Sequence, residues 1–240
     1  MNFYKDKIVF TGSSGRFGRI FKSVYSFKNI HYPSKKIFDV CNYRSIKKFL
    51  KKIKPKIIIH AAAISRPMII HDNYPQKSIQ TNIIGTSNLT IVCMEMGIKI
   101  IYFSTNYVYP INDKSNKESD PVLPINNYAL SKMGGECAVQ MYKNSLVLRI
   151  FMSERPFVHG GAYTDVKTNF LYHEEVVKLI PKIINSQGIL NIGGKTQTVY
   201  SFAKLSKINV KKIKAKKILK KKYFKNQIVD TSKLNNFLKN

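Results

Sequence analysis

Short apolar runs alternate with amphipathic stretches along most of the chain. Six runs rich in Ile, Val, Leu, Phe and Tyr have the length of buried strands: residues 7–11, 29–32, 56–60, 99–104, 145–150 and 188–192. Between them, apolar residues recur at helical spacing, which predicts amphipathic helices near residues 17–25, 45–54, 76–96, 126–143 and 174–185. This alternation predicts an α/β fold, a Rossmann-type doubly wound parallel sheet with helices on both faces.

The pattern loosens after residue 150. Residues 153–169 are rich in Gly, Thr and Asp and predict a loop, whereas the later strand at 188–192 should rejoin the main sheet. Residues 207–225 are dense in lysine but punctuated by Ile, Val and Leu, which predicts a solvated face with a thin apolar side. We therefore expect a main α/β unit over residues 1–150 and a small second part over residues 151–240.

Composition narrows the class of protein. Hydrophobic residues make up 44% of the 240, which excludes wholesale disorder, and the longest nearly apolar stretch, residues 57–64, is too short to cross a bilayer. The N-terminus lacks the pattern of a secretory signal. The three cysteines are widely separated and no CxxC is present, so we expect no disulfide framework, no metal site and a reducing cytoplasmic location.

The formal net charge is +28, which is typical of many nucleic-acid-binding proteins. However, 35 of the 41 basic residues are lysine, and residues with AT-rich codons are abundant throughout the chain. We interpret most of the excess as a compositional bias and expect no nucleic-acid partner. A further interpretation is that the positive charge attracts anionic ligands in general.

Three glycines, Gly12, Gly15 and Gly18, stand between the first strand and the first helix at GxxGxxG spacing. Glycines at such a turn let backbone N–H groups approach a diphosphate, and the helix N-terminus favours its negative charge. We interpret the turn as a dinucleotide site, with a purely structural glycine-rich turn as the alternative.

The end of the second strand bears on which dinucleotide binds. An acidic residue there would bond the ribose 2′-hydroxyl of NAD, but the segment carries Ser34 and Lys35. Their hydroxyl and ammonium groups, with the guanidinium of Arg16, suit the 2′-phosphate of NADP. We therefore expect NADP(H), with NAD(H) as the alternative, and place Asp39 and Val40 nearer the adenine.

Five Tyr/Lys pairs have the YxxxK spacing that puts both side chains on one helix face. Among 14 tyrosines and 35 lysines such pairs arise by chance, so the spacing alone identifies nothing. Tyr128/Lys132 differs from the others because it begins the helix after a strand that ends in Ser104 and Thr105, at the ligand-binding edge of the sheet. Thr105 can polarise a carbonyl while Tyr128 delivers a proton, and an ammonium at Lys132 would lower the phenol's pKa.

These motifs resemble the extended short-chain dehydrogenases/reductases, and especially the dTDP-4-dehydrorhamnose reductase branch, which acts on nucleotide sugars. The matching stretches are TGSSGRFG (11–18), HAAAISRP (60–67), NIIGT (82–86), STNYVYP (104–110) and NNYALSKMGGE (126–136). Weaker matches continue in the same order to about residue 194. The resemblance implies an NAD(P)-binding domain over residues 1–150 and a reduced substrate-binding region over residues 151–240.

The resemblance also implies roles for single residues. Thr105, Tyr128 and Lys132 would be the catalytic triad. The residues expected at the cofactor are Gly12, Ser14, Gly15, Arg16, Phe17, Gly18, Ser34, Lys35, Asp39, Val40, Ala61, Ala62, Ala63, Asn82, Tyr128 and Lys132. Those expected at the substrate are Ser104, Asn106 and Arg149, and loop residues Arg155, His159, Tyr163 and Asp165 are candidates with them.

The residue after Thr105 separates branches of this family. By resemblance, dehydratases carry Asp-Glu there and epimerase-reductases of the fucose-synthase type carry Cys, whereas this chain has Asn106-Tyr107, and the reductase branch usually has Asp. We expect NADPH-dependent reduction of a nucleotide-linked 4-keto-6-deoxy sugar. The alternatives are an NAD(P)-dependent sugar-nucleotide epimerase and a non-catalytic, cofactor-binding regulatory subunit. The expected partner is a nucleotide sugar, with no membrane, and a homodimer is left open.

Overall fold

The computed structural model describes residues 1–112, 114–215 and 226–239, and its centre is a six-stranded parallel sheet. In sheet order the strands are β11 (Gly188–Ile192), β6 (Ser145–Ile150), β4 (Lys99–Phe103), β3 (Ile57–His60), β1 (Ile8–Thr11) and β2 (Ile30–His31). From β1 the chain goes outward to β2 and returns to β3 on the other side of β1. The resulting switch point, where ligands bind in doubly wound folds, lies between β1 and β3, which confirms the predicted Rossmann-type fold.

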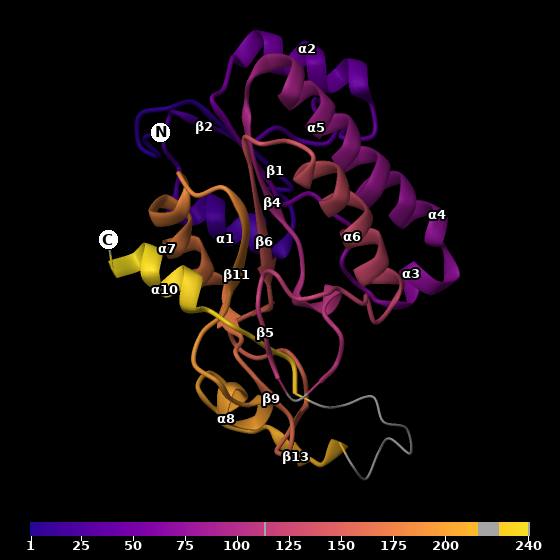
Figure 1. Cartoon of the computed structure of the whole chain (residues 1–240), viewed down its shortest axis with the longest axis vertical. Coiled ribbons are helices and arrows are strands. Elements are labelled where there is room, and N and C mark those ends of the chain that lie inside the picture. The colour runs from indigo at the N-terminus through magenta and orange to yellow at the C-terminus, as the bar shows by residue number, and fades with distance from the viewer. Residues whose placement is uncertain (113, 216–225, 240) are drawn as a thin grey trace.

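Helices cover both faces of the sheet (Figure 1). One layer holds α1 (Arg16–Val24), α7 (His173–Ile183) and α10 (Ser232–Lys239), and the other holds α2 (Tyr43–Ile53), α5 (Gly85–Met96) and α6 (Asn127–Gln140). Side chains alternate along each strand because successive Cβ atoms point to opposite faces. In β1, for example, Phe10 packs in the α1/α7 core and Val9 in the α2/α5 core.

The helix predicted over residues 76–96 is interrupted in the structure. A short helix α3 (Ile69–Asn73) precedes α4 (Pro75–Ser78), and a π-helical turn η1 (Ile79–Ile84) then leads into α5. A π-helical turn places an extra residue in the helix and often marks a functional position. Here the turn carries Asn82, which the apolar periodicity gave no reason to separate from the rest of the helix.

A smaller part lies below the carboxyl ends of the strands (Figure 1). It is built from η2 (Asn106–Val108), α8 (Val199–Lys204) and pairs of short strands: β5 (Ser115–Asn116) with β14 (Ile228–Val229), β7 (Met152–Ser153) with β10 (Leu171–Tyr172), β8 (Gly161–Tyr163) with β13 (Lys211–Ile213), and β9 (Lys167–Thr168) with β12 (Gln197–Thr198). The predicted loop over residues 153–169 thus contains β8 and β9. Strands of two or three residues are too short to show alternation in a sequence.

The strand predicted at 188–192 rejoins the main sheet as β11, parallel to β6, as expected. The division of the chain into two domains at residue 150 stays a prediction. Residues 216–225 of the lysine-dense stretch, like residues 113 and 240, lie outside the described residues. Within the described part, no helix has both the length and the apolar character needed to cross a membrane.

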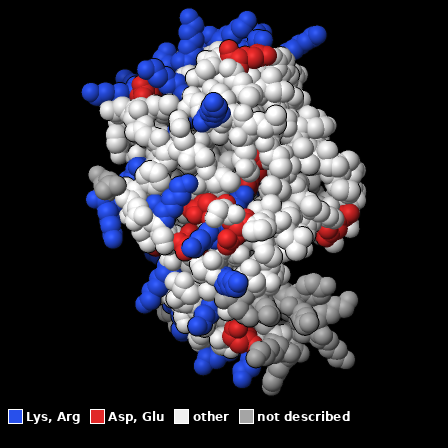
Figure 2. Space-filling model, in the orientation of Figure 1, with Lys and Arg blue, Asp and Glu red and all other residues white. Residues whose placement is uncertain are grey.

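Lysine and arginine are scattered over the face shown in Figure 2 and do not gather in one patch. This distribution agrees with a general enrichment in lysine. The expected lack of a nucleic-acid partner stays a prediction.

Candidate functional site

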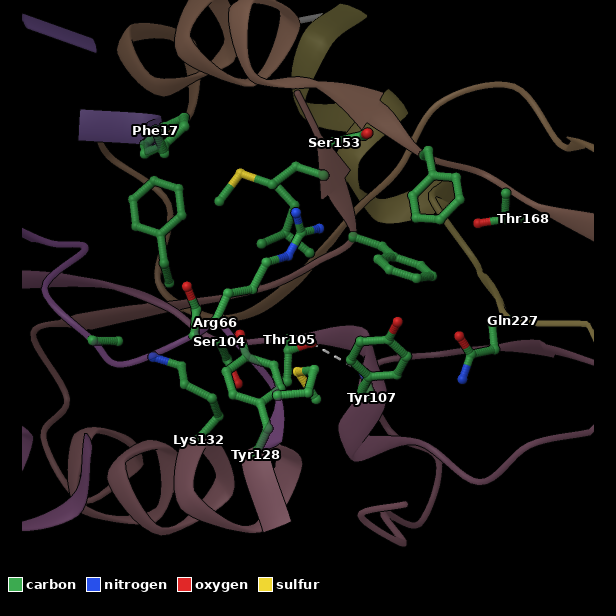
Figure 3. Close-up of a pocket in the computed structure, with 18 of the residues that line it drawn as sticks. Phe17, Arg66, Ser104, Thr105, Tyr107, Tyr128, Lys132, Ser153, Thr168 and Gln227 are labelled. Atoms are coloured by element: carbon green, nitrogen blue, oxygen red, sulfur yellow. Dashed lines mark hydrogen bonds between the residues drawn. The ribbon is translucent and has the colours of Figure 1, made fainter. Parts of the chain in front are cut away.

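A cleft of about 1510 Å³ opens at the carboxyl ends of β1, β3, β4 and β6, between the main sheet and the smaller part. The glycine turn and Ala61 and Ala63 line one end, Thr105, Tyr128 and Lys132 line its wall, and residues of the smaller part close the other end. Figure 3 shows the side chains of Thr105, Tyr128 and Lys132 along one side of this space. The structure therefore brings together residues that are far apart in the sequence.

The glycine turn is shaped as a cradle for a ligand. Gly12 has φ +81°, and a Cβ there would stand 2.7 Å from the backbone nitrogen of Ala62, so only glycine fits. A Cβ on Gly18 would overlap the carbonyl oxygen of Gly12. Helix α1 begins at Arg16, directly after Gly15, and its first N–H groups have no partner within the helix. This arrangement suits a diphosphate.

Helix α6 carries Tyr128 and Lys132 one turn apart. Asn126 caps the helix, because its side-chain oxygen accepts a hydrogen bond from the backbone N–H of Ala129 at 2.8 Å. The cap sets where the helix begins and therefore where Tyr128, in the first turn, enters the cleft. Thr105 caps η2 in the same way, accepting a 3.3 Å hydrogen bond from the N–H of Tyr107 (Figure 3).

Tyr128 is half-buried in the wall of the cleft, and its surroundings shift the pKa of its phenol in opposite directions. Burial raises the pKa of Tyr128 to about 12, while the Thr105 side chain and the positive charges of Arg66 and Arg16 act to lower it. Tyr128 is thus protonated at neutral pH, as a proton donor must be. The lowering of this pKa by Lys132 stays a prediction, because burial, Thr105 and the two arginines are the effects the structure gives.

Lys132 is buried, with its Nζ 4.1 Å from the centre of the Tyr102 ring. Burial lowers the pKa of Lys132 to about 7, and the carboxylate of Glu136, one turn along α6, acts to raise it. With a pKa near neutrality, Lys132 changes its protonation state easily, and an anion that enters the cleft would raise this pKa. The ammonium form is then favoured where it is needed to hold a polar ligand.

Behind the cleft, Glu136 organises a buried ion pair. Arg149 donates to Glu136 Oε1 from Nη2 at 2.7 Å and from Nε at 3.0 Å, and Ser104 donates to the other carboxylate oxygen. Arg149 also donates to the hydroxyl of Tyr109 at 2.8 Å. We expected Arg149 at the substrate. The structure instead commits it to this network, outside the residues that line the cleft, because an unpaired carboxylate at Glu136 would be costly in the core.

The other two residues expected at the substrate differ from each other. Ser104 lines the cleft, although its hydroxyl is engaged by Glu136. Asn106 is 4% exposed and lies outside the lining residues, and its Oδ1 atom has no hydrogen-bond partner among the described residues. Direct substrate contact by either residue stays a prediction.

Asn82 supports the wall of the cleft from the π-helical turn. Its amide accepts from the backbone N–H of Ile64 at 2.8 Å, donates to the Ile64 carbonyl at 2.9 Å and donates to Ser131 Oγ at 2.9 Å. It therefore ties the segment after β3 to helix α6. Ala62, in the same segment, donates its backbone N–H to Thr11 Oγ1 at 3.2 Å.

The residues expected around the adenosine half lie apart from the cleft lining. Val40 packs in the core against Gly85, and the Asp39 carboxylate accepts the N–H of Cys41 at 3.0 Å. Ser14, Ser34 and Lys35 are likewise absent from the lining, whereas Phe17 is part of it. A role for Ser34 and Lys35 at a 2′-phosphate stays a prediction.

Arg16 points in a different direction from the one expected. Its guanidinium lies 3.4 Å from Ser65 Oγ and 3.3 Å from Glu154 Oε1, toward the triad and the smaller part. Arg66 pairs with the same Glu154 oxygen at 3.1 Å. Sequence reasoning missed both Arg66 and Glu154. Arg66 stands within the HAAAISRP stretch, but Glu154 is 88 residues from Arg66, and only the fold brings the two together.

Aromatic rings line the end of the cleft opposite the glycine turn. The ring centres of Tyr107 and Phe151 are 4.8 Å apart, and those of Phe151 and Phe170 are 3.9 Å apart. Thr168 and Gln227 border this end from two different segments (Figure 3). These residues are dispersed over the sequence, so no local motif announces them.

The polar loop residues divide between two environments. His159 and Tyr163 line the cleft, and their contact with a substrate stays a prediction. Arg155 instead lies over the ring of Tyr172, 4.2 Å from its centre, and Asp165 accepts the backbone N–H of Ala215 at 2.9 Å. The structure thus retains two of the four loop candidates at the cleft.

A family model described as the RmlD substrate-binding domain matches residues 6–171. The chain belongs to this family. Among curated relatives, methionine adenosyltransferase 2 subunit beta of Xenopus laevis is 27% identical over 154 residues, which are 60% of this chain and 46% of the relative. GDP-6-deoxy-D-talose 4-dehydrogenase of Aggregatibacter actinomycetemcomitans is 28% identical over 195 residues, 78% of this chain and 62% of that protein. This RmlD-family chain spans about half the length of the curated relatives first matched.

Solved structures share the fold of this RmlD-family chain. The dTDP-4-dehydrorhamnose reductase of Bacillus anthracis, solved with NADP, has a TM-score of 0.83 at 20% identity and covers 97% of this chain and 92% of that one. The UDP-N-acetylglucosamine 4-epimerase of Methanobrevibacter ruminantium has a TM-score of 0.78 at 19% identity, covering 99% and 92%. At such identities the likeness shows a common fold.

Proposed function

We propose that the protein is an NADP(H)-dependent reductase of a nucleotide-linked 4-keto-6-deoxy sugar. One observation carries the proposal: Thr105, Tyr128 and Lys132 line the same cleft as the glycine turn. A dinucleotide bound at the turn would extend toward the triad, and the aromatic end of the cleft would take the nucleotide sugar. Three of the similar proteins reported above have names that refer to position 4 of a nucleotide sugar: a 4-dehydrogenase, a 4-dehydrorhamnose reductase and a 4-epimerase.

The residues present fit a nicotinamide dinucleotide. The cradle of Gly12, Gly15 and Gly18 would hold the diphosphate on backbone N–H groups, and Ala61 and Ala63 leave room beside it. Lys132 would hold the ribose. The bound dinucleotide supplies the hydride in such a reduction. NADP is proposed because Ser34 and Lys35 follow β2 and a similar structure was solved with NADP, whereas the WbmG enzyme of Bordetella bronchiseptica was solved with NAD.

The chain's own residues would perform the acid–base part of the reaction. Thr105 would donate a hydrogen bond to the substrate carbonyl oxygen and fix its position. Tyr128, protonated because burial raises its pKa, would transfer the phenolic proton to that oxygen. Lys132 would become fully cationic beside the bound ligand and stabilise the phenolate left behind.

The test of this proposal is Tyr128→Phe. NADPH binding is followed by fluorescence, and turnover by loss of NADPH absorbance with dTDP-, GDP- and UDP-linked 4-keto-6-deoxy sugars. We expect the variant to bind NADPH as the wild type does and to lose about 10²–10⁴-fold in kcat. Tyr43→Phe is the matched control, because Tyr43 and Lys47 have the same spacing and even touch, at 3.3 Å, on the surface of α2. Full turnover by Tyr128→Phe would exclude the proposed mechanism.

A second candidate is a cofactor-binding subunit of another enzyme. The observation that favours it is the match to proteins named as the beta subunit of methionine adenosyltransferase 2. Under this proposal the cleft binds a dinucleotide for structural reasons and Tyr128 is dispensable. This candidate would be favoured over the reductase if the wild type bound NADPH but reduced no sugar in the panel, and if Tyr128→Phe bound NADPH as the wild type does.

A further inference from the structure

Two arginines and one glutamate meet in the middle of the cleft. Arg16 is the first residue of α1, directly after the glycine turn, Arg66 comes from the segment after β3, and Glu154 from the segment after β7. A single carboxylate oxygen, Glu154 Oε1, lies 3.3 Å from Arg16 Nη1 and 3.1 Å from Arg66 Nη1. All three residues line the cleft, and Figure 3 shows the side chain of Arg66 extending into it.

The charges of this cluster do not balance. Two guanidinium groups face one carboxylate, so the cluster keeps a net positive charge within the cleft. The guanidinium groups of Arg16 and Arg66 also have donors to spare, because each contributes one nitrogen to Glu154 and each guanidinium carries five N–H donors. A diphosphate, with about two negative charges, would match the two arginines better than one carboxylate does.

A buried imidazole beside the cluster also lacks a partner. His173 is 6% exposed and lines the cleft, and its Nδ1 atom has no hydrogen-bond partner within the described part of the chain. Its ring packs edge-on against that of Phe17, in the first turn of α1, with the ring centres 5.7 Å apart. Burial lowers the pKa of His173, and Arg16, Arg66 and Glu154 all act on it electrostatically, which places it near the cluster. An unpartnered polar atom that lines a cleft indicates a site that a polar ligand completes.

We propose that Arg16, Arg66 and Glu154 form an anion-exchange site, in which the Glu154 carboxylate holds the two arginines in the empty cleft and a ligand diphosphate displaces it. The idea rests on the proposed function for the presence of such ligands, since both a nicotinamide dinucleotide and a nucleotide sugar carry a diphosphate. No bond is made or broken: one anion replaces another on the same donors. Because Glu154 belongs to the segment after β7, its release would also free that segment from the glycine turn.

The exchange predicts that removing the competitor strengthens ligand binding. Glu154→Gln should bind a diphosphate ligand about three- to tenfold more tightly, since the variant keeps the shape of Glu154 but not its charge. Arg66→Met should weaken binding about tenfold, and in the double variant the gain from Glu154→Gln should disappear. Glu95→Gln and Arg44→Met, on the outer helices, are the matched controls, because Glu95 also forms a partly exposed ion pair but far from the cleft.

The experiment is calorimetric titration of the full chain with three probes: inorganic pyrophosphate, NADPH and dTDP. Tightening by Glu154→Gln for NADPH alone assigns the site to the dinucleotide, and for dTDP alone to the nucleotide sugar. Unchanged affinity for all three probes would overturn the exchange site, while NADPH binding by the wild type would leave the proposed reductase standing. Conversely, tighter pyrophosphate binding by the variant, with no NADPH binding by any form, would refute the reductase and keep the anion site.

Discussion

Lys132 and Lys99 are both buried lysines, but their ammonium groups have different surroundings. Lys99, at the start of β4, donates to the Ser186 carbonyl at 2.7 Å. Lys132 lies in the cleft over the Tyr102 ring, and its pKa is lowered to about 7 by burial. A lysine without a close acceptor costs folding free energy, which is typical of residues kept for function.

The pKa of Lys132 predicts a definite pH dependence of stability. Between about pH 7 and the ordinary lysine pKa of 10.5, the unfolded state binds more protons than the folded state, so stability of the unliganded protein should rise with pH. Lys132→Met should reduce this dependence, of which the part due to burial of Lys99 remains, and raise the free energy of unfolding at pH 7 by about 2–4 kcal/mol, with turnover lost. Urea unfolding at several pH values measures the first effect. Lys99→Met, at the opposite end of the sheet from the cleft, should keep turnover.

Among the helices and strands, the contact between α6 and the π-helical turn η1 fixes the position of α6, which carries Tyr128 and Lys132. Gly135 allows it: a Cβ there would stand 2.5 Å from the Asn82 carbonyl oxygen and 2.7 Å from the hydroxyl of Tyr102. A Cβ on the neighbouring Gly134 would first meet the side chain of Ile83, at 2.8 Å, and that side chain can move. The two glycines of one helix therefore have different importance.

Gly135→Ala should force α6 away from η1 and disturb both stability and the position of Tyr128. We expect a loss of about 1–3 kcal/mol in the free energy of unfolding, as in other overpacked interfaces, together with a lower kcat. Gly134→Ala should cost clearly less, since a flexible side chain can give way. Thermal unfolding and turnover of the two variants, compared side by side, make the test; equal losses would contradict the role of the backbone contact.

The C-terminal segment links the two parts of the whole molecule (Figure 1). Asn169, next to β9, donates from Nδ2 to the Val229 carbonyl at 2.8 Å and accepts the Val229 N–H at 3.2 Å. Its side-chain amide thus makes the pair of hydrogen bonds that the backbone of a neighbouring strand would make. The chain then returns to the main sheet, where Leu234 of α10 is 2% exposed in the core. Lys233 donates to the Ile189 carbonyl of β11 at 2.6 Å.

Leu234→Ala should therefore destabilise the main unit even though it lies at the end of the chain. The expected loss is about 2–4 kcal/mol, because the buried side chain would leave a cavity. Phe237→Ala, on the same helix but 42% exposed, should change the free energy of unfolding by less than about 1 kcal/mol. Denaturant midpoints of both variants decide the matter, and a similar loss in each would refute the docking of α10.

The sequence by itself determined the strands of the main sheet, the glycine turn and the placement of Tyr128 and Lys132, out of five similar pairs, at the ligand-binding edge, where both line the cleft. These follow from local rules: apolar runs form buried strands, glycine permits a tight turn, and a strand end followed by a helix forms the ligand-binding edge. Tyr43 and Lys47 show why context was needed, because they touch each other and yet lie on the surface.

Only the tertiary structure decided which charges face the cleft. Arg149 turns inward to Glu136, Arg16 and Arg66 meet at Glu154, and the π-helical turn brings Asn82 to Ile64. None of these pairings has a signal in local spacing, because each joins residues from different elements. The physical reason is that an unpaired charge is costly away from water, so a buried or half-buried charged group pairs with the opposite charge that lies near it in the folded chain. Which groups lie near each other depends on the packing of the whole fold.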